Sequence, residues 1–281
     1  MIMDILVHIP TERPARPVID ASISLAASFG AHLDAIAIGY VSSGAAAFVL
    51  DGSAAPAVAT VFEMERERAA ERATVALTVF EAEARHAGIS YQSRAIADLP
   101  GDAAASIGAA ARLRDLAVVL QPEAEQQTFD NSVPMDILLQ AGSPVLFVPH
   151  ISRGPFTAKR IGICWDGSRL AARALKDAIP FLARADALFA ISIDGAETVP
   201  PDASLERLAK HLSRAGLPIK LIELPASNSE VQPSILSLAA DENLDMLVMG
   251  AYGHSRLREG LLGGVTREML RTMTVPTLMS H

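Results

Sequence analysis

Glycines near the end of the chain are spaced so that the backbone could hold an anion. An apolar run leads into Gly250 and Gly253, and after nine intervening residues come Gly263 and Gly264, where a helical pattern begins near Val265. Glycine lets backbone N–H groups approach a phosphoryl oxygen without a Cβ in the way. The free N–H groups at a helix start add partial positive charge. The loop therefore predicts a bound phosphate group, such as that of a nucleotide.

Three common phosphate or nucleophile motifs do not fit this loop. A Walker A loop needs Gly-Lys-Ser or Gly-Lys-Thr, and the chain has neither. The dinucleotide fingerprint needs glycines at its first, third and sixth positions, which the spacing here does not give. The stretch Gly253-His254-Ser255-Arg256 approaches a nucleophile elbow, but Leu257 stands where the second glycine is required. A serine hydrolase is excluded on that ground.

The string MGAYGHSRLREGLLGGVT, with two and then nine residues between its motif glycines, resembles the ATP-binding motif of the universal stress protein family. The resemblance implies an ATP site that includes Gly250, Gly253, His254, Gly263, Gly264, Val265 and Thr266. In that family a serine or threonine occupies the position of Gly264 and contacts the terminal phosphates. Losing one neutral hydrogen bond weakens binding by up to about tenfold. Thr266 could partly substitute for the missing hydroxyl.

Two further candidates directly follow strands expected in the second half of the chain. In open parallel sheets, ligands bind beyond the carboxyl ends of the strands. Asp166 follows the run 160–165, and its carboxylate could accept hydrogen bonds from ribose hydroxyls or the adenine amine. ATP-binding members of the family carry an aspartate at the corresponding place. The alternative is a turn or helix-cap acid. Ile193 ends the next strand, where the family contacts adenine through main-chain groups.

The elements that would position these residues follow from alternating apolar runs and helical patterns. Short Val/Ile/Leu-rich runs predict buried parallel strands joined by crossover helices. Strands are expected at 4–9, 33–41, 91–96, 115–120, 144–149, 160–165, 186–193, 218–224, 244–250 and 276–280. Helices are expected at 18–29, 60–86, 102–113, 134–140, 169–183, 205–215, 232–241 and 265–272. The pattern repeats with a period of about 130 residues.

The repeat predicts an α/β fold of two tandem open α/β sandwiches, each with a mainly parallel five-stranded sheet flanked by helices. The resemblance implies the adenine-nucleotide α-hydrolase-like type. We expect domains at 1–150 and 159–281, with a junction near Gly154 and Pro155. In the first half, Pro10-Thr11 replaces the aspartate, and the acidic stretch 121–125 replaces the glycine loop. This degenerate half should repel phosphate.

Composition narrows the range of partners. The net charge of −8 argues against a general nucleic-acid binder. The N-terminus lacks a basic region and a cleavage site, so a cytoplasmic protein is expected. The segment 41–61 is interrupted by Gly, Asp and Pro, which favours a linker or lid over a membrane span. The single cysteine, Cys164, excludes an internal disulfide and should be inert. The histidines show no ligand spacing, so any Mg²⁺ would arrive with the phosphates.

These observations favour a cytoplasmic ATP-binding universal stress protein with a regulatory or stress-response role. No general base is evident, so slow ATP hydrolysis is the most that we expect. The alternative is a nucleotide-free tandem scaffold for protein interaction. A third hypothesis is an enzyme that transfers adenylyl groups, but the chain lacks the recognisable catalytic signatures of such enzymes. The edge strands near 144–148 and 276–280 could pair within the chain. The halves would then form an intramolecular pseudo-dimer, and two chains could still form a homodimer through the remaining surfaces.

Overall fold

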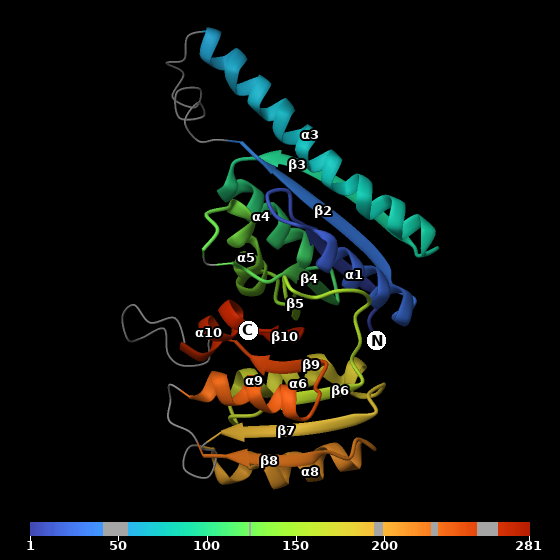
Figure 1. The fold of residues 1–281 in the computed structure, drawn as a ribbon, viewed down its shortest axis with the longest axis vertical. Coiled ribbons are helices and arrows are strands. Elements are labelled where there is room, and N and C mark those ends of the chain that lie inside the picture. The colour runs from blue at the N-terminus through green and yellow to red at the C-terminus, as the bar shows by residue number, and fades with distance from the viewer. Residues whose placement is uncertain (42–55, 124, 194–198, 226–229, 252–263) are drawn as a thin grey trace. The chain divides into compact units, whose positions relative to one another are not determined.

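The computed structural model describes residues 1–41, 56–123, 125–193, 199–225, 230–251 and 264–281. They form two compact α/β units, whose elements are labelled in Figure 1. The N-terminal unit comprises residues 2–143 and 153–155. The C-terminal unit comprises residues 144–152 and 156–281, together with Met1. The domain limits of 1–150 and 159–281 stay a prediction.

The N-terminal unit is built on a parallel sheet whose strand order is β3-β2-β1-β4. Its strands are β1 (Asp4–Ile9), β2 (His32–Tyr40), β3 (Tyr91–Asp98) and β4 (Leu116–Leu120). The register pairs Ile5 with Leu33 on one side and with Leu116 on the other. All three side chains are fully buried, as expected of a parallel sheet covered on both faces.

The helices of this unit are α1 (Arg16–Phe29), α3 (Pro56–His86), α4 (Pro100–Ala111) and α5 (Val133–Gln140), with a short 3₁₀ turn η1 (Phe129–Asn131). Helix α3 packs on β2 and β3, and α4 packs against α5. Gly39 in β2 makes the first contact possible, because a Cβ added there would lie 1.8 Å from the carbonyl oxygen of Ala69 in α3. The backbone of α3 therefore lies directly on the sheet.

The C-terminal unit has the strand order β5-β10-β9-β6-β7-β8. Its strands are β5 (Val145–Val148), β6 (Arg160–Cys164), β7 (Ala187–Ile193), β8 (Lys220–Leu224), β9 (Met246–Gly250) and β10 (Thr277–Ser280). The pairs are parallel except β5 with β10, which run antiparallel and place Thr277 beside Phe147. The expected pairing of segments 144–148 and 276–280 is therefore present. The pseudo-dimer of the two halves stays a prediction.

The helices of the C-terminal unit are α6 (Arg169–Leu182), α8 (Leu205–Arg214), α9 (Val231–Asp241) and α10 (Gly264–Thr272), with a 3₁₀ turn η2 (Pro201–Ala203). Helix α6 lies against β9 and β10, and α8 lies against β7 and β8. The buried side chains Leu170, Ala174 and Ala178 of α6 recur every four residues. This spacing gives one apolar stripe that faces the sheet.

Every strand and helix expected from the sequence is present. The largest shift of a helix end is at α3, which begins at Pro56 rather than at Thr60. Of the segment 41–61, residues 42–55 lie outside the described residues, and 56–61 belong to α3. Among the described helices, none has the length and apolar character needed to cross a membrane.

Candidate functional site

The turn between β6 and α6 positions Asp166. Its Oδ1 accepts a hydrogen bond of 2.9 Å from the backbone N–H of Ser168. Ser168 is the N-cap of α6, and its Oγ accepts a hydrogen bond of 3.1 Å from the N–H of Ala171. Asp166 therefore forms an Asx turn, which is the turn alternative of the sequence interpretation, while the helix cap is Ser168. Asp166 is exposed, and its Oδ2 has no hydrogen-bond partner among the described residues. One carboxylate oxygen is thus free for a ligand.

The same turn is held in place by packing. Gly167 has a φ of 69°, and a Cβ added there would lie 2.7 Å from Cγ1 of Val199. The left-handed conformation and the close approach both require glycine. Beside it, the indole Nε1 of Trp165 donates a hydrogen bond of 2.7 Å to the carbonyl oxygen of Ala203. The segment 199–203 therefore fixes the turn that carries Asp166.

The strand register brings three of the predicted residues to one edge of the sheet. Cys164 in β6 pairs with Ile191 in β7. Two residues further along each chain segment, Asp166 and Ile193 therefore lie at the same end of the sheet. Ile163 pairs with Val248 in β9, which brings the end of β9 at Gly250 to the same edge. Strand β6 lies between β7 and β9, where the strand order changes direction. This switch point is where ligands bind in open α/β sheets.

Gly250 has a packing role that the sequence did not indicate. A Cβ added there would lie 2.6 Å from the backbone N of Ala171 and 2.6 Å from the carbonyl C of Leu170. The first turn of α6 therefore lies directly against the end of β9. Gly250 is needed to seat this helix start at the switch point, whatever else it contacts.

The other motif residues lie at the start of α10 or outside the described residues. Gly264 is exposed, and a Cβ added there would meet no atom within 4 Å. Val265 is partly exposed, whereas Thr266 is 5% exposed. The helix is tied to α9, because Gln232 Nε2 donates a hydrogen bond of 2.7 Å to Thr272 Oγ1.

The remaining predicted loop residues, Gly253, His254 and Gly263, lie outside the described residues, as do Tyr252, Ser255, Arg256 and Arg258. The described contacts therefore establish the switch-point edge with Asp166, Ile193 and Gly250. They do not join the start of α10 to this edge. The phosphate-binding end of the predicted site stays a prediction.

Cysteine and metal chemistry add little to this site. Burial, and then the charge of Asp166, raise the pKa of the Cys164 thiol to about 12. The thiol is therefore protonated and a poor nucleophile at neutral pH. Over the described parts of the chain, no cluster of three or more His, Cys, Asp or Glu side chains could hold a metal ion. A metal at this edge would need other ligands, such as phosphate oxygens.

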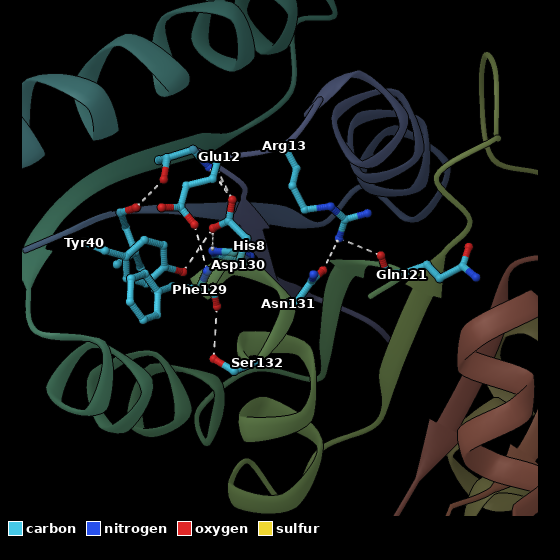
Figure 2. Close-up of polar contacts among 11 residues, drawn as sticks. His8, Glu12, Arg13, Tyr40, Gln121, Phe129, Asp130, Asn131 and Ser132 are labelled. Atoms are coloured by element: carbon cyan, nitrogen blue, oxygen red, sulfur yellow. Dashed lines mark hydrogen bonds and ion pairs between the residues drawn. The ribbon is translucent and has the colours of Figure 1, made fainter. Parts of the chain in front are cut away.

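The corresponding edge of the N-terminal unit holds a buried carboxylate (Figure 2). Asp130, in η1, is 2% exposed. Its Oδ2 accepts hydrogen bonds of 2.9 Å from the N–H of Thr11 and 2.7 Å from the N–H of Glu12, in the loop after β1. Its Oδ1 accepts a hydrogen bond of 3.0 Å from the hydroxyl of Tyr40 at the end of β2. The protein's own carboxylate thus occupies the backbone donors of this loop.

A histidine and an arginine lie beside this carboxylate. His8, at the end of β1, is 1% exposed, and its Nε2 lies 3.7 Å from Oδ1 of Asp130. Burial, and then the charge of Arg13, lower the pKa of His8 to about 3. Burial raises the pKa of Asp130 in spite of its donors. Arg13 NH1 donates hydrogen bonds of 2.7 Å to the carbonyl of Gln121 and 2.9 Å to Oδ1 of Asn131. His8 is therefore neutral at physiological pH.

Sequence patterns singled out the acidic stretch after β4 but not this cluster of Asp130, His8 and Tyr40. A signal was present, since His8 interrupts the otherwise apolar run Ile5–Ile9 and a polar side chain in a buried strand indicates polar neighbours. The identity of those neighbours depends on a contact over 122 residues of chain, which no local pattern reveals.

Known proteins match the chain most clearly in its second half. The family model of the universal stress protein family matches residues 157–281. Universal stress protein Slr1230 of Synechocystis sp. is 36% identical over 76 residues, which span 27% of this chain and 25% of that protein. Universal stress protein MJ0577 of Methanocaldococcus jannaschii is 32% identical over 75 residues, 27% of this chain and 44% of that protein. These alignments therefore span less than half of either curated relative.

A solved structure extends the likeness in fold to the whole chain. A universal stress protein from Archaeoglobus fulgidus DSM 4304 superposes with a TM-score of 0.73. It is 17% identical in sequence, and the match covers 98% of this chain and 97% of that one. At this identity the likeness concerns the fold alone. The sequence evidence concerns the second half of the chain: residues 157–281 match the universal stress protein family.

Proposed function

We propose that the C-terminal unit binds ATP and that the protein acts as a cytoplasmic regulatory or stress-response protein. The observation that carries the proposal is the free carboxylate oxygen of Asp166 at the switch point between β6 and β9. The ends of β7 and β9, at Ile193 and Gly250, reach the same edge. The glycine spacing that follows β9 in the sequence supplies the expected phosphate loop.

Each part of this edge has a distinct role in the proposal. Oδ2 of Asp166 accepts a hydrogen bond from a ribose hydroxyl or the adenine amine, while Oδ1 keeps the Asx turn closed. The main chain at Ile193 contacts the adenine ring. Gly250 lets α6 approach, and the loop through Gly253 and Gly263 holds the phosphates, which bring any Mg²⁺ with them. The proposal is one of binding, with no group assigned to activate water.

The test compares two aspartate variants of the full chain by calorimetric titration with Mg-ATP. Asp166→Asn keeps an oxygen that can close the turn on Ser168, but it removes the charge and puts an NH2 donor in place of the acceptor Oδ2. We expect it to weaken ATP binding by about tenfold, since hydrogen bonds to charged groups contribute about 1.5–3 kcal/mol. Asp186→Asn is the matched control, because its side chain is 73% exposed and precedes β7, at the opposite end of that strand from Ile193.

Co-purified ligand gives a second readout. Denaturing the purified protein and assaying the supernatant should release adenine nucleotide. If neither co-purified nucleotide nor binding of millimolar Mg-ATP is found, the nucleotide-free scaffold is the correct function. Equal affinities of Asp166→Asn and Asp186→Asn for ATP would show that the nucleotide binds somewhere other than at this edge.

A further inference from the structure

A groove in the N-terminal unit is not used by any role described above. It has a volume of about 790 Å³ and lies between the loop after β1, the start of α1 and one side of α3. This volume is in the range of small-molecule sites. Its wall on α3 contains Arg68, Glu71, Arg72, Val75, Ala76 and Val79.

The groove side of α3 is distinct from the side that packs on the sheet. Ala69, Ala73 and Leu77 are buried against the sheet, with Phe80 and Ala84 continuing the same stripe. Arg68, Arg72, Val75 and Val79 follow one another at steps of four, three and four residues, which places them on one helical face. Val75 is 63% exposed and Val79 is 51% exposed. The protein therefore leaves a short apolar surface uncovered along this wall.

Positive charge is concentrated beside this apolar surface. The groove is lined by four arginines, Arg13, Arg16, Arg68 and Arg72, and by one acid, Glu71. Arg72 NH2 donates a hydrogen bond of 2.9 Å to the carbonyl oxygen of Tyr40, which leaves its charge without a carboxylate. Arg68 is exposed and forms no hydrogen bond or ion pair with any residue that the structure describes. These two guanidinium groups, one turn apart on α3, can meet an anion together.

The other arginines of the groove are already engaged. Arg13 is 7% exposed, and its NH2 lies 3.4 Å from Oε1 of Glu123. Arg16 forms ion pairs of 2.8 Å with Asp20 and 2.7 Å with Glu83, one turn beyond Val79 on α3. The Arg16–Glu83 pair joins α1 to α3 at that level. The available positive charge is thus at the Arg68–Arg72 end, with apolar side chains between it and the ion pair.

We propose that this groove binds an amphipathic organic anion: a carboxylate headgroup on Arg68 and Arg72, with an unbranched apolar chain along Val75 and Val79. Seven residues separate Arg72 from Val79, which corresponds to about 10 Å of helix and a chain of about nine carbons. The local charge is opposite to the net charge of −8 on the chain, so it is a specific feature of this groove. The site belongs to the other unit and does not depend on ATP binding.

The test titrates the full-length protein with decanoate, below its micelle concentration, by calorimetry. Decanol offers the same chain without the charge, and acetate offers the charge without the chain. We expect saturable binding of decanoate, with decanol and acetate each bound at least about tenfold more weakly. The affinity for decanoate should fall with added salt, because the head contacts are ionic and partly exposed.

Two double variants locate the site. Arg68→Gln with Arg72→Gln should weaken decanoate binding by about tenfold or more, since both headgroup contacts are lost. Arg66→Gln with Arg94→Gln removes the same charge from exposed residues outside the groove and should leave binding unchanged. Circular dichroism establishes that both double variants are folded, and their affinity for Mg-ATP should equal that of the wild type.

A third variant tests the apolar wall. Val75→Thr with Val79→Thr keeps the shape of the side chains and should reduce the difference in affinity between decanoate and hexanoate. The proposal is overturned if decanoate shows no saturable binding, if decanol binds as tightly, or if the two arginine double variants bind decanoate equally. Loss of ATP binding alone, in any variant, would count against the nucleotide site and leave the groove intact.

Discussion

Strand β1 of the N-terminal unit and strand β6 of the C-terminal unit end in different ways, although each lies between two parallel neighbours, β2 and β4 for β1 and β7 and β9 for β6. In the N-terminal unit the loop after β1 donates the N–H groups of Thr11 and Glu12 to Asp130, a carboxylate of the same unit. In the C-terminal unit the loop after β6 is closed by Asp166 itself, through Ser168. One edge is filled from within and the other presents a free carboxylate oxygen.

The difference teaches that the donors at such an edge can be satisfied by the protein itself. Buried backbone donors must find acceptors. Asp130 supplies one from η1, and Tyr40 and His8 enclose it. An anionic ligand at this edge would have to displace a carboxylate that accepts three hydrogen bonds. In the C-terminal unit the turn is satisfied by one oxygen of Asp166, so a ligand could bind there without breaking protein contacts.

The largest test of this comparison removes each carboxylate in turn. Asp130→Ala leaves two part-buried N–H groups and a buried tyrosine hydroxyl without their acceptor, and we expect it to lower the free energy of unfolding by about 3 kcal/mol. Asp166→Ala removes one exposed turn contact and should cost about 1 kcal/mol. Urea denaturation followed by hydrogen exchange at the amides of each unit measures both costs.

The single tryptophan, Trp165, adds a probe of one unit. Its fluorescence follows the C-terminal unit, so Asp130→Ala should lower the urea midpoint seen by exchange at the amides of β1 and β2 more than the midpoint seen by fluorescence. Equal stability losses for the two alanine variants would mean that both carboxylates have the same structural role, and the contrast between the edges would be wrong.

The second-largest expected effect is a loss of stability at low pH that is confined to the N-terminal unit. The pKa of His8 is lowered from 6.5 to about 3 in the folded state, so the unfolded chain binds more protons between these values. The stabilisation is complete above pH 6.5 and is lost as the pH falls toward 3. The histidine alone is expected to cost the N-terminal unit about 3 kcal/mol by pH 4. Urea titrations between pH 7 and 4, resolved by hydrogen exchange, measure this slope.

The charged groups that face His8 also affect how the stability of the N-terminal unit depends on pH. Asp130 contributes in the opposite sense, because its raised pKa favours the folded state at low pH and that contribution is lost as the pH rises. Arg13 stays charged throughout. His8→Gln removes the histidine term and should flatten or reverse the slope, whereas His86→Gln, an exposed change at the end of α3, should leave it as in the wild type. A slope unaltered by His8→Gln would contradict the assignment.

The fold was predictable because its signals are local. Continuous apolar runs such as Leu116–Leu120 and Met246–Gly250 indicated buried parallel strands, and the helices between them carried their own periodicity. The predicted helix ends were less accurate, as at Pro56, because terminal residues have few contacts that fix the boundary.

The sites were only partly predictable. Position after a strand was enough to single out Asp166, since every strand end of a parallel sheet lies at the same edge. The interior of the N-terminal edge was not, because Asp130 meets Thr11 across 119 residues of chain. The packing role of Gly250 was also hidden, since a glycine required by α6 and one required by phosphate look the same in a sequence.

The smallest effect concerns Gly264, where the resemblance to the universal stress protein family implies a hydroxyl residue. Its position at the start of α10 has room for a side chain, as no atom lies within 4 Å of an added Cβ. If the C-terminal edge binds ATP, Gly264→Ser adds one donor and should tighten Mg-ATP binding by up to about tenfold, the worth of one neutral hydrogen bond. Gly264→Ala adds the Cβ without the hydroxyl and should change the affinity by less than about twofold, because glycine already fits the site.

Calorimetric titration of both variants separates the effect of the hydroxyl from the effect of the restricted backbone. If both variants bind Mg-ATP more tightly by the same factor, the gain comes from a stiffer helix start. Tighter binding by the serine variant alone would place the terminal phosphates at this residue, and so extend the open edge of the C-terminal unit from Asp166 to α10.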